Sequence, residues 1–433
     1  MRYPIRLVLA ALAVAGPALS AQLPITLQHA RPVDQRGVNM FEPPKQDTVS
    51  FTGPRVNIGA AFRQDFQALQ HENTAAPRMV TVGGVTTDAN QLITVGHGFN
   101  NAVANLYLDA QLAKGIRVAM TSYLSARHHN ETWVKDGYIL IDASPFNNAT
   151  LDRVMKYTTV KVGEFEMNYG DGHFRRTDNG QALYNPLVGN YILDAFTTEI
   201  GAEVYLRKGS WLGMAGLTNG EIHGMVLSPD KRAPAFYGKV GFDRQVDPDL
   251  RVRLTGSAIT QARSTNQSLY GGDRAGSVYY DIMENTTSTE SSNAWSGRIR
   301  NPFSSKIQGQ VINPFVKYGN AEFFGQFEWA QGNNGPTEPV DRHIQQQVYE
   351  GVYRLANDQL YLAGRYDTFS GRLAGIANDV SVDRYQVGGG WYVTQNLLAK
   401  LEWVDQKYHD FPATDIRAGG HFKGFMVSAG VAF

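Results

Sequence analysis

The chain has 433 residues, of which 42% are hydrophobic, 11% aromatic and 18% charged, with 40 basic and 40 acidic side chains. This composition excludes a disordered chain, and the zero formal net charge leaves no electrostatic footprint for wrapping nucleic acid. The sequence contains no cysteine, which excludes a disulfide framework, a thiolate metal site and a thiol nucleophile.

Residues 1–21 have the pattern of an export signal. Arg2 and Arg6 form a positive start, residues 7–16 form an uncharged apolar run, and small residues at 18–21 offer a cleavage site. Without those two arginines, 38 basic side chains stand against 40 acidic ones, a formal net charge of −2. No later run approaches the roughly 18 apolar residues that a transmembrane helix needs. We therefore expect export to the periplasm and no helical membrane anchor.

Residues 22–53 are polar and contain Pro24, Pro32, Pro43 and Pro44. A segment of this composition cannot form a hydrophobic core of its own. We expect an extended periplasmic N-terminal arm. Two states of this arm remain open: an ordered contact with the lumen or with a neighbouring subunit, and simple disorder.

Between residues 54 and 433, apolar and polar side chains alternate with a period of two, which is typical of β-strands. The alternation is clearest near the middle, where Ala321, Phe323 and Trp329 share one face and Glu322 and Glu328 share the other. The pattern predicts strands at 55–69, 101–112, 116–126, 133–142, 156–166, 197–207, 211–219, 235–246, 250–261, 306–318, 321–331, 346–355, 359–369, 384–393, 397–408 and 422–433.

The connections between these strands alternate between short and long. Residues 113–115 and 208–210 are short connections, whereas 167–196 and 262–305 are long ones. Short turns on one rim and long loops on the other are typical of outer-membrane barrels, and closure leaves no backbone group unpaired in lipid. The sequence therefore predicts an all-β fold: a single transmembrane antiparallel barrel at 54–433, with about 16 strands, short periplasmic turns and long extracellular loops, in the bacterial outer membrane. A count of 14 or 18 strands would fit nearly as well.

Aromatic side chains lie near many of the predicted strand ends. Outer-membrane barrels carry aromatic girdles at both membrane interfaces, and these residues are candidates for such girdles. For any one of them, packing in a core is an equally good interpretation. The candidates are Tyr107, Tyr123, Trp133, Phe165, Trp211, Trp329, Tyr361, Trp391, Trp403 and Tyr408.

Two stretches resemble known barrels. Residues 422–433 alternate and end in Phe433, which resembles the terminal strand by which Gram-negative outer-membrane barrels are recognised for insertion. Residues 160–170, Val-Lys-Val-Gly-Glu-Phe-Glu-Met-Asn-Tyr-Gly, resemble the strand-to-loop passage of the phosphate-selective porin O and P family, and residues 110–115 and 135–138 are compatible with its first hairpins. The resemblance implies a 16-stranded trimer that conducts small anions past an inward third loop with basic residues.

The third long loop, 167–196, contains Asp171, Arg175, Arg176 and Asp178. Its 30 residues are enough for it to fold into a lumen. The resemblance therefore implies a pore constriction at these four residues, where the two arginines act on the solute through their electric field. In the alternative interpretation, the arginines pair with the two nearby aspartates or contact lipopolysaccharide.

The predicted lumen face carries charges of both signs. Opposed charges create a transverse field that orients dipolar solutes without strong preference for one ion sign. For each single residue, a salt bridge that stiffens the interior is the more frequent role, and a bulge would invert the assignment. The pore-lining candidates are Arg117, Lys161, Glu199, Glu203, Arg207, Arg251, Arg253, Glu322, Arg365 and Lys400.

The sequence offers no catalytic or cofactor motif. It contains no nucleotide-binding glycine fingerprint, no Walker loop and no Gly-x-Ser-x-Gly elbow. His128 and His129 are adjacent, so on a strand they would point to opposite faces, and no third ligand is spaced to join them. We therefore expect no enzyme activity, no cofactor and no metal site.

The function predicted from these patterns is that of an outer-membrane porin. Such a porin forms a water-filled channel for passive diffusion of small hydrophilic solutes and ions, and anions such as phosphate are among the candidates. The expected partners are outer-membrane lipid, lipopolysaccharide, the solutes and two further copies in a homotrimer, without nucleic acid. Two alternatives stay open: a barrel with a structural or lipid-hydrolysing role, and a soluble secreted β-protein.

Overall fold

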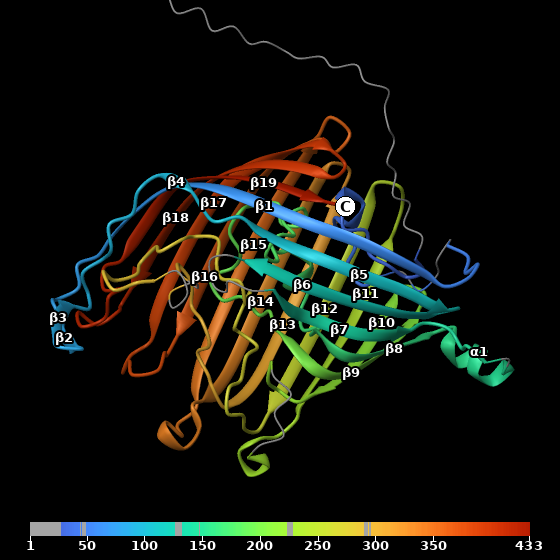
Figure 1. The fold of residues 1–433 in the computed structure, drawn as a ribbon, viewed down its shortest axis with the longest axis horizontal. Helices are drawn as coiled ribbons and strands as arrows, with labels where there is room; N and C mark the ends of the chain where they lie inside the picture. Colours follow the sequence, from blue (N-terminus) through green and yellow to red (C-terminus); the bar gives the residue numbers. More distant parts are fainter. Residues whose placement is uncertain are drawn as a thin grey trace, which may run out of the picture.

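Sixteen long antiparallel strands form a closed barrel, which confirms the predicted fold class (Figure 1). The structure, a computed structural model, describes residues 27–433 apart from 44, 46–48, 126–131, 147, 223–227, 290–292 and 294–295. The expected export signal at 1–21 and the pair His128 and His129 lie outside the described residues. Within the described residues, no helix is long and apolar enough to cross a membrane.

The strands agree closely with the predicted ranges, except that β15 and β17 begin four residues earlier, at Arg342 and Val380. Both early segments carry polar outward side chains and buried apolar inward ones such as Ile344 and Val382, so their parity is the reverse of the apolar outer face from which the strands were predicted. The barrel strands are β1 (Arg55–Glu72), β5 (Val103–Ala113), β6 (Ile116–Ser125), β7 (Trp133–Ile141), β8 (Thr158–Glu166), β9 (Thr198–Lys208), β10 (Trp211–Thr218), β11 (Ala235–Gln245), β12 (Leu250–Gln261), β13 (Lys306–Tyr318), β14 (Ala321–Asn333), β15 (Arg342–Leu355), β16 (Leu360–Gly371), β17 (Val380–Thr394), β18 (Leu397–His409) and β19 (His421–Ala432).

The remaining elements belong to the connections. They are the hairpin strands β2 (Met79–Val82) and β3 (Val85–Asp88), the two-residue strand β4 (Gly98–Phe99), the helix α1 (Ala149–Met155), and the 3-10 turns η1 (Gln35–Gly37), η2 (Gly172–Arg175), η3 (Pro229–Lys231) and η4 (Gly335–Thr337). Strand β4 pairs with β1 and so extends the barrel wall near its long-loop rim.

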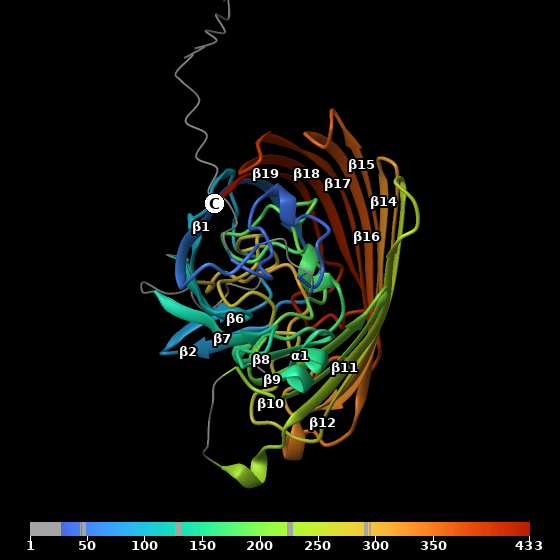
Figure 2. The same cartoon turned by 90° about the vertical axis from the view of Figure 1, so that its right-hand side faces the viewer.

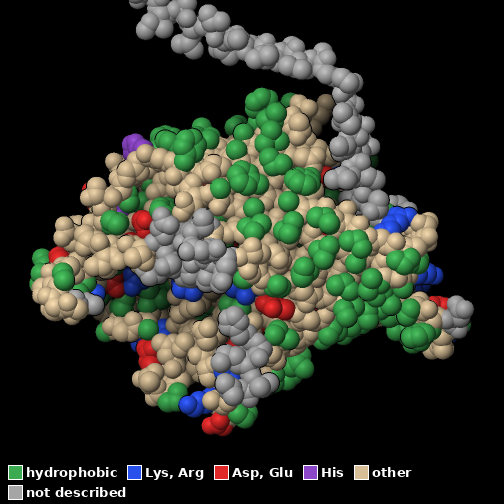
Figure 3. All heavy atoms as spheres, in the orientation of Figure 1, with side chains coloured by type: hydrophobic (Ala, Val, Ile, Leu, Met, Phe, Trp, Pro, Cys, Tyr) green, Lys and Arg blue, Asp and Glu red, His purple; other side chains and the backbone are tan. Residues whose placement is uncertain are grey.

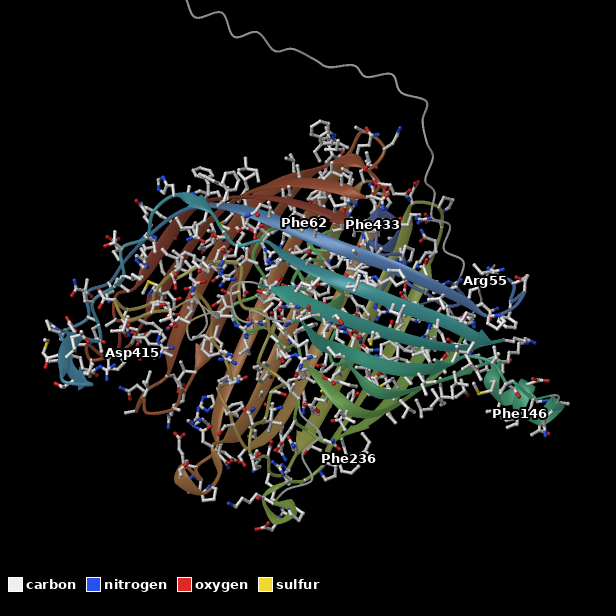
Figure 4. The ribbon with its side chains drawn as sticks, in the orientation of Figure 1. Arg55, Phe62, Phe146, Phe236, Asp415 and Phe433 are labelled. Atoms are coloured by element: carbon white, nitrogen blue, oxygen red, sulfur yellow. The ribbon has the colours of Figure 1, made fainter. Side chains whose placement is uncertain are left out.

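The barrel closes where β1 pairs with both β19 and β5. Ala60 and Phe433 exchange two backbone hydrogen bonds of 2.9 Å each, and Phe62 is the register partner of Val431. Figure 4 places Phe62 and Phe433 beside each other at this seam. The same view places Arg55 at the short-turn end and Asp415 at the opposite, long-loop end. The last strand therefore leaves no unpaired edge.

The tight turns depend on glycines with positive φ. Gly319 has φ of 55° in the two-residue connection between β13 and β14, and Gly209 has φ of 60° between β9 and β10. An L side chain rarely adopts this left-handed conformation without strain, so glycine is the natural residue there. These turns set the register that sends acidic and basic side chains to the inside of the barrel.

The outer surface is an apolar belt, and Figure 3 shows it over β1 and β5 to β8. Aromatic side chains bound the belt toward the long-loop rim, where Tyr349, Tyr366 and Tyr385 are direct cross-strand neighbours. The rings of Tyr366 and Tyr385 stack with centroids 4.8 Å apart. Near the short turns, Trp391 and Phe433 are each 52% exposed. Two aromatic rows flanking an apolar belt are typical of membrane barrels.

The girdle prediction is right for some aromatics and wrong for others. Trp211, Trp329 and Trp391 point outward and are 67%, 44% and 52% exposed. The side chains of four other candidates are buried inside the barrel, because they lie on the inward parity of their strands. These four residues are Tyr123, Phe165, Tyr361 and Tyr408.

Candidate functional site

Three segments fill the barrel interior (Figure 2). They are the inward loop (residues 167–196), the second loop (residues 262–305) and the described part of the N-terminal arm (residues 27–53). Most side chains of the inward loop are buried, and Leu269, Tyr270 and Tyr279 of the second loop are at most 3% exposed. The charged groups of the barrel wall therefore contact loop and arm atoms.

The inward loop is hydrogen-bonded to the wall on the far side of the lumen. The backbone N–H groups of Val188 and Gly189 donate to Glu402 of β18 at 2.7 and 3.0 Å. Lys400, also on β18, donates from Nζ to three loop carbonyls at 2.7, 3.0 and 3.2 Å. Two side chains on one strand thus bind the loop backbone: the carboxylate of Glu402 accepts from its N–H groups, and the ammonium of Lys400 donates to its carbonyl groups.

Arg175 reaches from the inward loop to the wall and is 2% exposed. Its Nη2 lies 2.7 Å from Glu350 Oε1 and 3.8 Å from Glu322 Oε2. Its Nη1 donates to Asn39 of the arm. Each of the two glutamates has a second cation, since Arg365 lies 2.5 Å from Glu350 and Arg354 lies 2.5 Å from Glu322. Arg175 is therefore the third cation in a cluster with two carboxylates.

Arg176 is held within the loops and not by the wall. Its Nη2 lies 2.7 Å from Asp194 Oδ2, and its Nη1 lies 3.6 Å from Asp178 Oδ1. Its guanidinium carbon lies 3.7 Å from the ring centroid of Phe196, a cation–π distance. The adjacent arginines thus have separate partners: Arg175 joins the inward loop to β15, and Arg176 joins two parts of the same loop.

The two aspartates of the predicted constriction also have separate partners. Asp171 is fully buried, with Oδ2 2.8 Å from Arg253 Nε and Oδ1 2.7 Å from Lys239 Nζ. Asp178 Oδ2 lies 2.6 Å from Lys135 Nζ. The alternative in which the arginines pair with these aspartates therefore holds for Arg176, which lies near Asp178, whereas Arg175 pairs with Glu350.

Asp171 links the docking of the inward loop to pH. Burial alone would raise the pKa of Asp171, but Arg253 and Lys239 outweigh it and lower the pKa from 3.8 to about 2. A carboxyl whose pKa is lower in the folded state contributes stability that is complete above its ordinary value and is lost as the pH falls through the folded value. The loop should therefore stay docked at pH 4 and loosen near pH 2.

Pepsin cleavage of the folded barrel measures this docking directly, because pepsin is active throughout that range. Cleavage between residues 167 and 196 should rise steeply as the pH falls from 4 to 2. The Asp171→Asn variant lacks the titrating group, so its cleavage should already be high at pH 4 and change little. Equal profiles for both proteins would rule out Asp171 as the group that controls docking.

The ten pore-lining candidates all lie on the inward parity of their strands, and most are ion-paired. Arg253 binds Asp171, Arg365 binds Glu350, and Glu322 binds Arg354. The other ion pairs are Arg117 with Asp109 at 2.8 Å, Lys161 with Glu203 at 3.4 Å, and Arg251 with Asp243 at 2.7 Å. Salt bridges thus occupy much of the predicted lumen face.

Three candidates have partners of another kind. Glu199 is fully buried and accepts a hydrogen bond from Thr218 Oγ1 at 2.5 Å. Arg207 donates to the carbonyl of Pro43 in the arm. The third, Lys400, binds the inward loop as described above.

Sequence reasoning missed several residues of this interior. Lys239 and Glu350 lie on inward faces of strands that were predicted, so parity alone could have found them. Nothing in the sequence pattern indicated that the second loop folds inward. Its Tyr270 hydroxyl donates to Glu328 at 2.8 Å, and its Tyr279 hydroxyl donates to Glu402 at 2.7 Å.

Comparison with known proteins identifies the fold. No family model matches the sequence, and no curated protein matches it. Among solved structures, the anion-selective porin from Comamonas acidovorans aligns with a TM-score of 0.52 at 10% identity, over 88% of this chain and 100% of that chain. OprB of Pseudomonas putida aligns with a TM-score of 0.51 at 10% identity, over 88% and 94%. The loop L8 deletion mutant of OmpT, an outer membrane protein of Vibrio cholerae, aligns with a TM-score of 0.51 at 10% identity, over 88% and 100%. The chain therefore has the fold of a porin-like outer-membrane barrel.

Proposed function

We propose that this protein is an outer-membrane porin that passes small hydrophilic solutes and ions by passive diffusion. The observation that carries the proposal is the contrast between the two faces of the closed barrel. The outer face is apolar between two aromatic rows, whereas the inner face carries ion pairs and hydrogen-bonding side chains. Polar groups in the interior can replace part of the hydration shell of a hydrophilic solute, which the apolar outer face cannot do.

The inward loop and the arm are the parts of this channel that control its width. Arg175, Arg176, Asp171 and Asp178 form the proposed constriction, and the wall charges form its surroundings. Because the cations have carboxylate neighbours, the field in the lumen is mixed in sign, and ion selectivity is weak. Anions, phosphate included, are candidate solutes that the resemblance to the phosphate-selective porins supports.

Single-channel recording in a planar bilayer tests this proposal. The refolded, detergent-purified protein should produce discrete current steps, with a reversal potential near zero or weakly biased across a salt gradient. We further propose a homotrimer, for which the channels should close in groups of three, each closure lowering the current by one step. Folded barrel that gives no conductance would refute the channel. Strong anion preference that disappears when Arg175 and Arg176 are replaced would move the assignment to the phosphate-selective type.

Outer-membrane lipid and lipopolysaccharide are the proposed surroundings of the barrel. Between the long-loop rim and the nearby aromatic row, the outward faces of β13 to β15 become polar. Their side chains Gln308, Gln331, His343 and Gln345 line a hollow of about 790 Å³. The amide and imidazole groups of this hollow can form hydrogen bonds with the hydroxyl groups of lipopolysaccharide sugars. Native mass spectrometry of the protein extracted from outer membranes should detect bound lipopolysaccharide, and replacing Gln331 and Gln345 with leucine should reduce it.

A further inference from the structure

The N-terminal arm lies inside the barrel at the short-turn rim (Figure 2). Polar contacts join it to the inward loop and to the wall. Arg31 donates to the carbonyl of Phe174 at 3.0 Å, and Asn39 donates to Glu322 at 2.7 Å. One aromatic anchor accompanies these contacts, since the ring of Phe41 lies edge-on to Phe315 with centroids 5.3 Å apart. Phe41 thereby joins a small buried cluster with Phe315 and Phe324, and Val33 and Val38 pack against a second one, so polar and apolar contacts together hold the arm in place.

Glu42 of the arm lies in a cluster of donors. Its Oε2 is 2.9 Å from Arg253 Nη2, and its Oε1 is 3.3 Å from Lys239 Nζ. The side-chain amide of Asn168 donates to the same Oε1 at 3.2 Å. Burial would raise the pKa of Glu42, but Arg253, Lys239 and Arg207 together hold it well below its ordinary value. The arm thus places an ionised carboxylate among wall cations.

The carboxylate of Glu42 borders a hollow of about 410 Å³ that also touches Arg253, Arg207, Lys156 and Lys208. In the part of the chain that the structure describes, Lys156, Arg207 and Lys208 are in no ion pair with a carboxylate. Arg207 Nε is buried without a hydrogen-bond partner among the described residues. The hollow therefore has the size of a small-molecule site and an excess of unpaired cations.

From this geometry we propose that Glu42 occupies a carboxylate-binding subsite, which a small carboxylate-bearing solute takes when the arm withdraws from the barrel. The inference rests on the proposed channel function and names a solute class for it. Arg253 and Asn168 provide directed N–H donors, which match a carboxylate better than they match a spherical ion such as chloride. The unpaired cations of the hollow contact the rest of the solute, and they can bind a second carboxylate of the same solute.

The arm acts in this arrangement as a tethered competitor. A carboxylate tethered to the same wall competes at an effective concentration of the order of millimolar, so a free solute must reach that range to replace it. Removing the charge of Glu42 removes the competitor but leaves Arg253, Lys239 and Asn168 in place. The subsite then becomes available to a solute at a lower concentration.

The subsite is tested by measuring how far succinate reduces the current that potassium chloride carries through the channel. Succinamide, a neutral diamide of similar size, is the control compound without carboxylates. For the Glu42→Gln variant, the succinate concentration that halves the current should be about tenfold lower than for the unmodified protein, because the tethered competitor is gone. Adding Arg207→Gln to this variant should weaken the block several-fold. Lys114→Gln, which removes a cation from another short turn, should leave the block unchanged. Succinate that acts no better than succinamide on any variant would overturn the subsite.

Liposome swelling in glucose separates failure of the subsite from failure of the channel. Glucose entry through the unmodified protein and the Glu42→Gln variant supports the channel whatever succinate does. Glucose entry without a succinate-specific block refutes the subsite alone. If folded protein admits neither glucose nor ions, both the channel and the subsite are refuted. Heat-dependent mobility in gel electrophoresis confirms that each variant is a folded barrel.

Discussion

Replacing Asp171 with asparagine is expected to lower the free energy of unfolding by roughly 3 kcal/mol, the lower end of the range for removing one partner of a buried ion pair. Asp171 is fully buried and binds Arg253 through two hydrogen bonds of 2.8 and 2.9 Å, in addition to the contact with Lys239. The loss stays near the lower end because both cations retain other partners: Arg253 keeps Glu42, and Lys239 keeps the carbonyl of Gly170 at 2.6 Å.

Urea unfolding of the barrel refolded in lipid vesicles measures this change. Asp243→Asn is the matched control, because Asp243 also binds Arg253, at 3.2 Å, but its side chain is 25% exposed. A partly exposed ion pair contributes less than about 1 kcal/mol, so this control should unfold almost like the unmodified protein. Equal losses for the two variants would contradict the assignment of Asp171 as the main anchor of the inward loop.

The second large effect is expected on ion selectivity. Arg175→Gln removes one cation from a cluster of three arginines and two glutamates, which leaves Arg354 paired with Glu322 and Arg365 paired with Glu350. The cluster then changes from a net charge of +1 to zero, and the reversal potential should shift toward cations. At 0.1 M salt the permeability ratio should change several-fold, and the shift should shrink toward 1 M salt as the Debye length falls from about 10 to about 3 Å.

Arg176→Gln and Arg417→Gln are the comparisons for this measurement. Arg176 is paired with Asp194 inside the loops, so its replacement should destabilise the loop more than it changes selectivity. Arg417 lies in the connection between β18 and β19, where it pairs with Asp415 at 2.7 Å, and its replacement removes the same charge far from the constriction. A selectivity shift as large for Arg417→Gln as for Arg175→Gln would show that the whole-protein charge is responsible, and not the cluster.

Alternation with a period of two was enough to locate nearly every strand, because a wall between lipid and a polar interior imposes opposite requirements on successive side chains. The segment from Ala321 to Trp329 is an example: its predicted faces are the observed ones. The same signal was lost at the starts of β15 and β17, where Gln345 and Ser381 face outward above the apolar belt. There the parity is reversed, because the apolar Ile344 and Val382 face inward, so these segments do not continue the apolar outer face of their strands.

The interior was less predictable, because its contacts join residues far apart in the sequence. Arg175 and Glu350 are separated by 175 positions, and Glu42 and Arg253 by 211. Parity correctly indicated that each wall charge faces the lumen, but a charge facing the lumen is compatible with many partners. Nearness to a strand end is not enough to assign an aromatic girdle residue, since Tyr123 shares the inward face of its strand with Arg117 and is buried.

The sequence by itself determined the barrel, its short-turn and long-loop rims, and the side chains that face lipid, since these depend on local alternation and on connection lengths. Only the tertiary structure decided how the lumen is filled. Closure of the barrel brings the inward loop, the second loop and the arm into one enclosed volume, and buried charges there require partners in close contact. The pairing of Asp171 with Arg253, and the insertion of Glu42 beside it, follow from that enclosure.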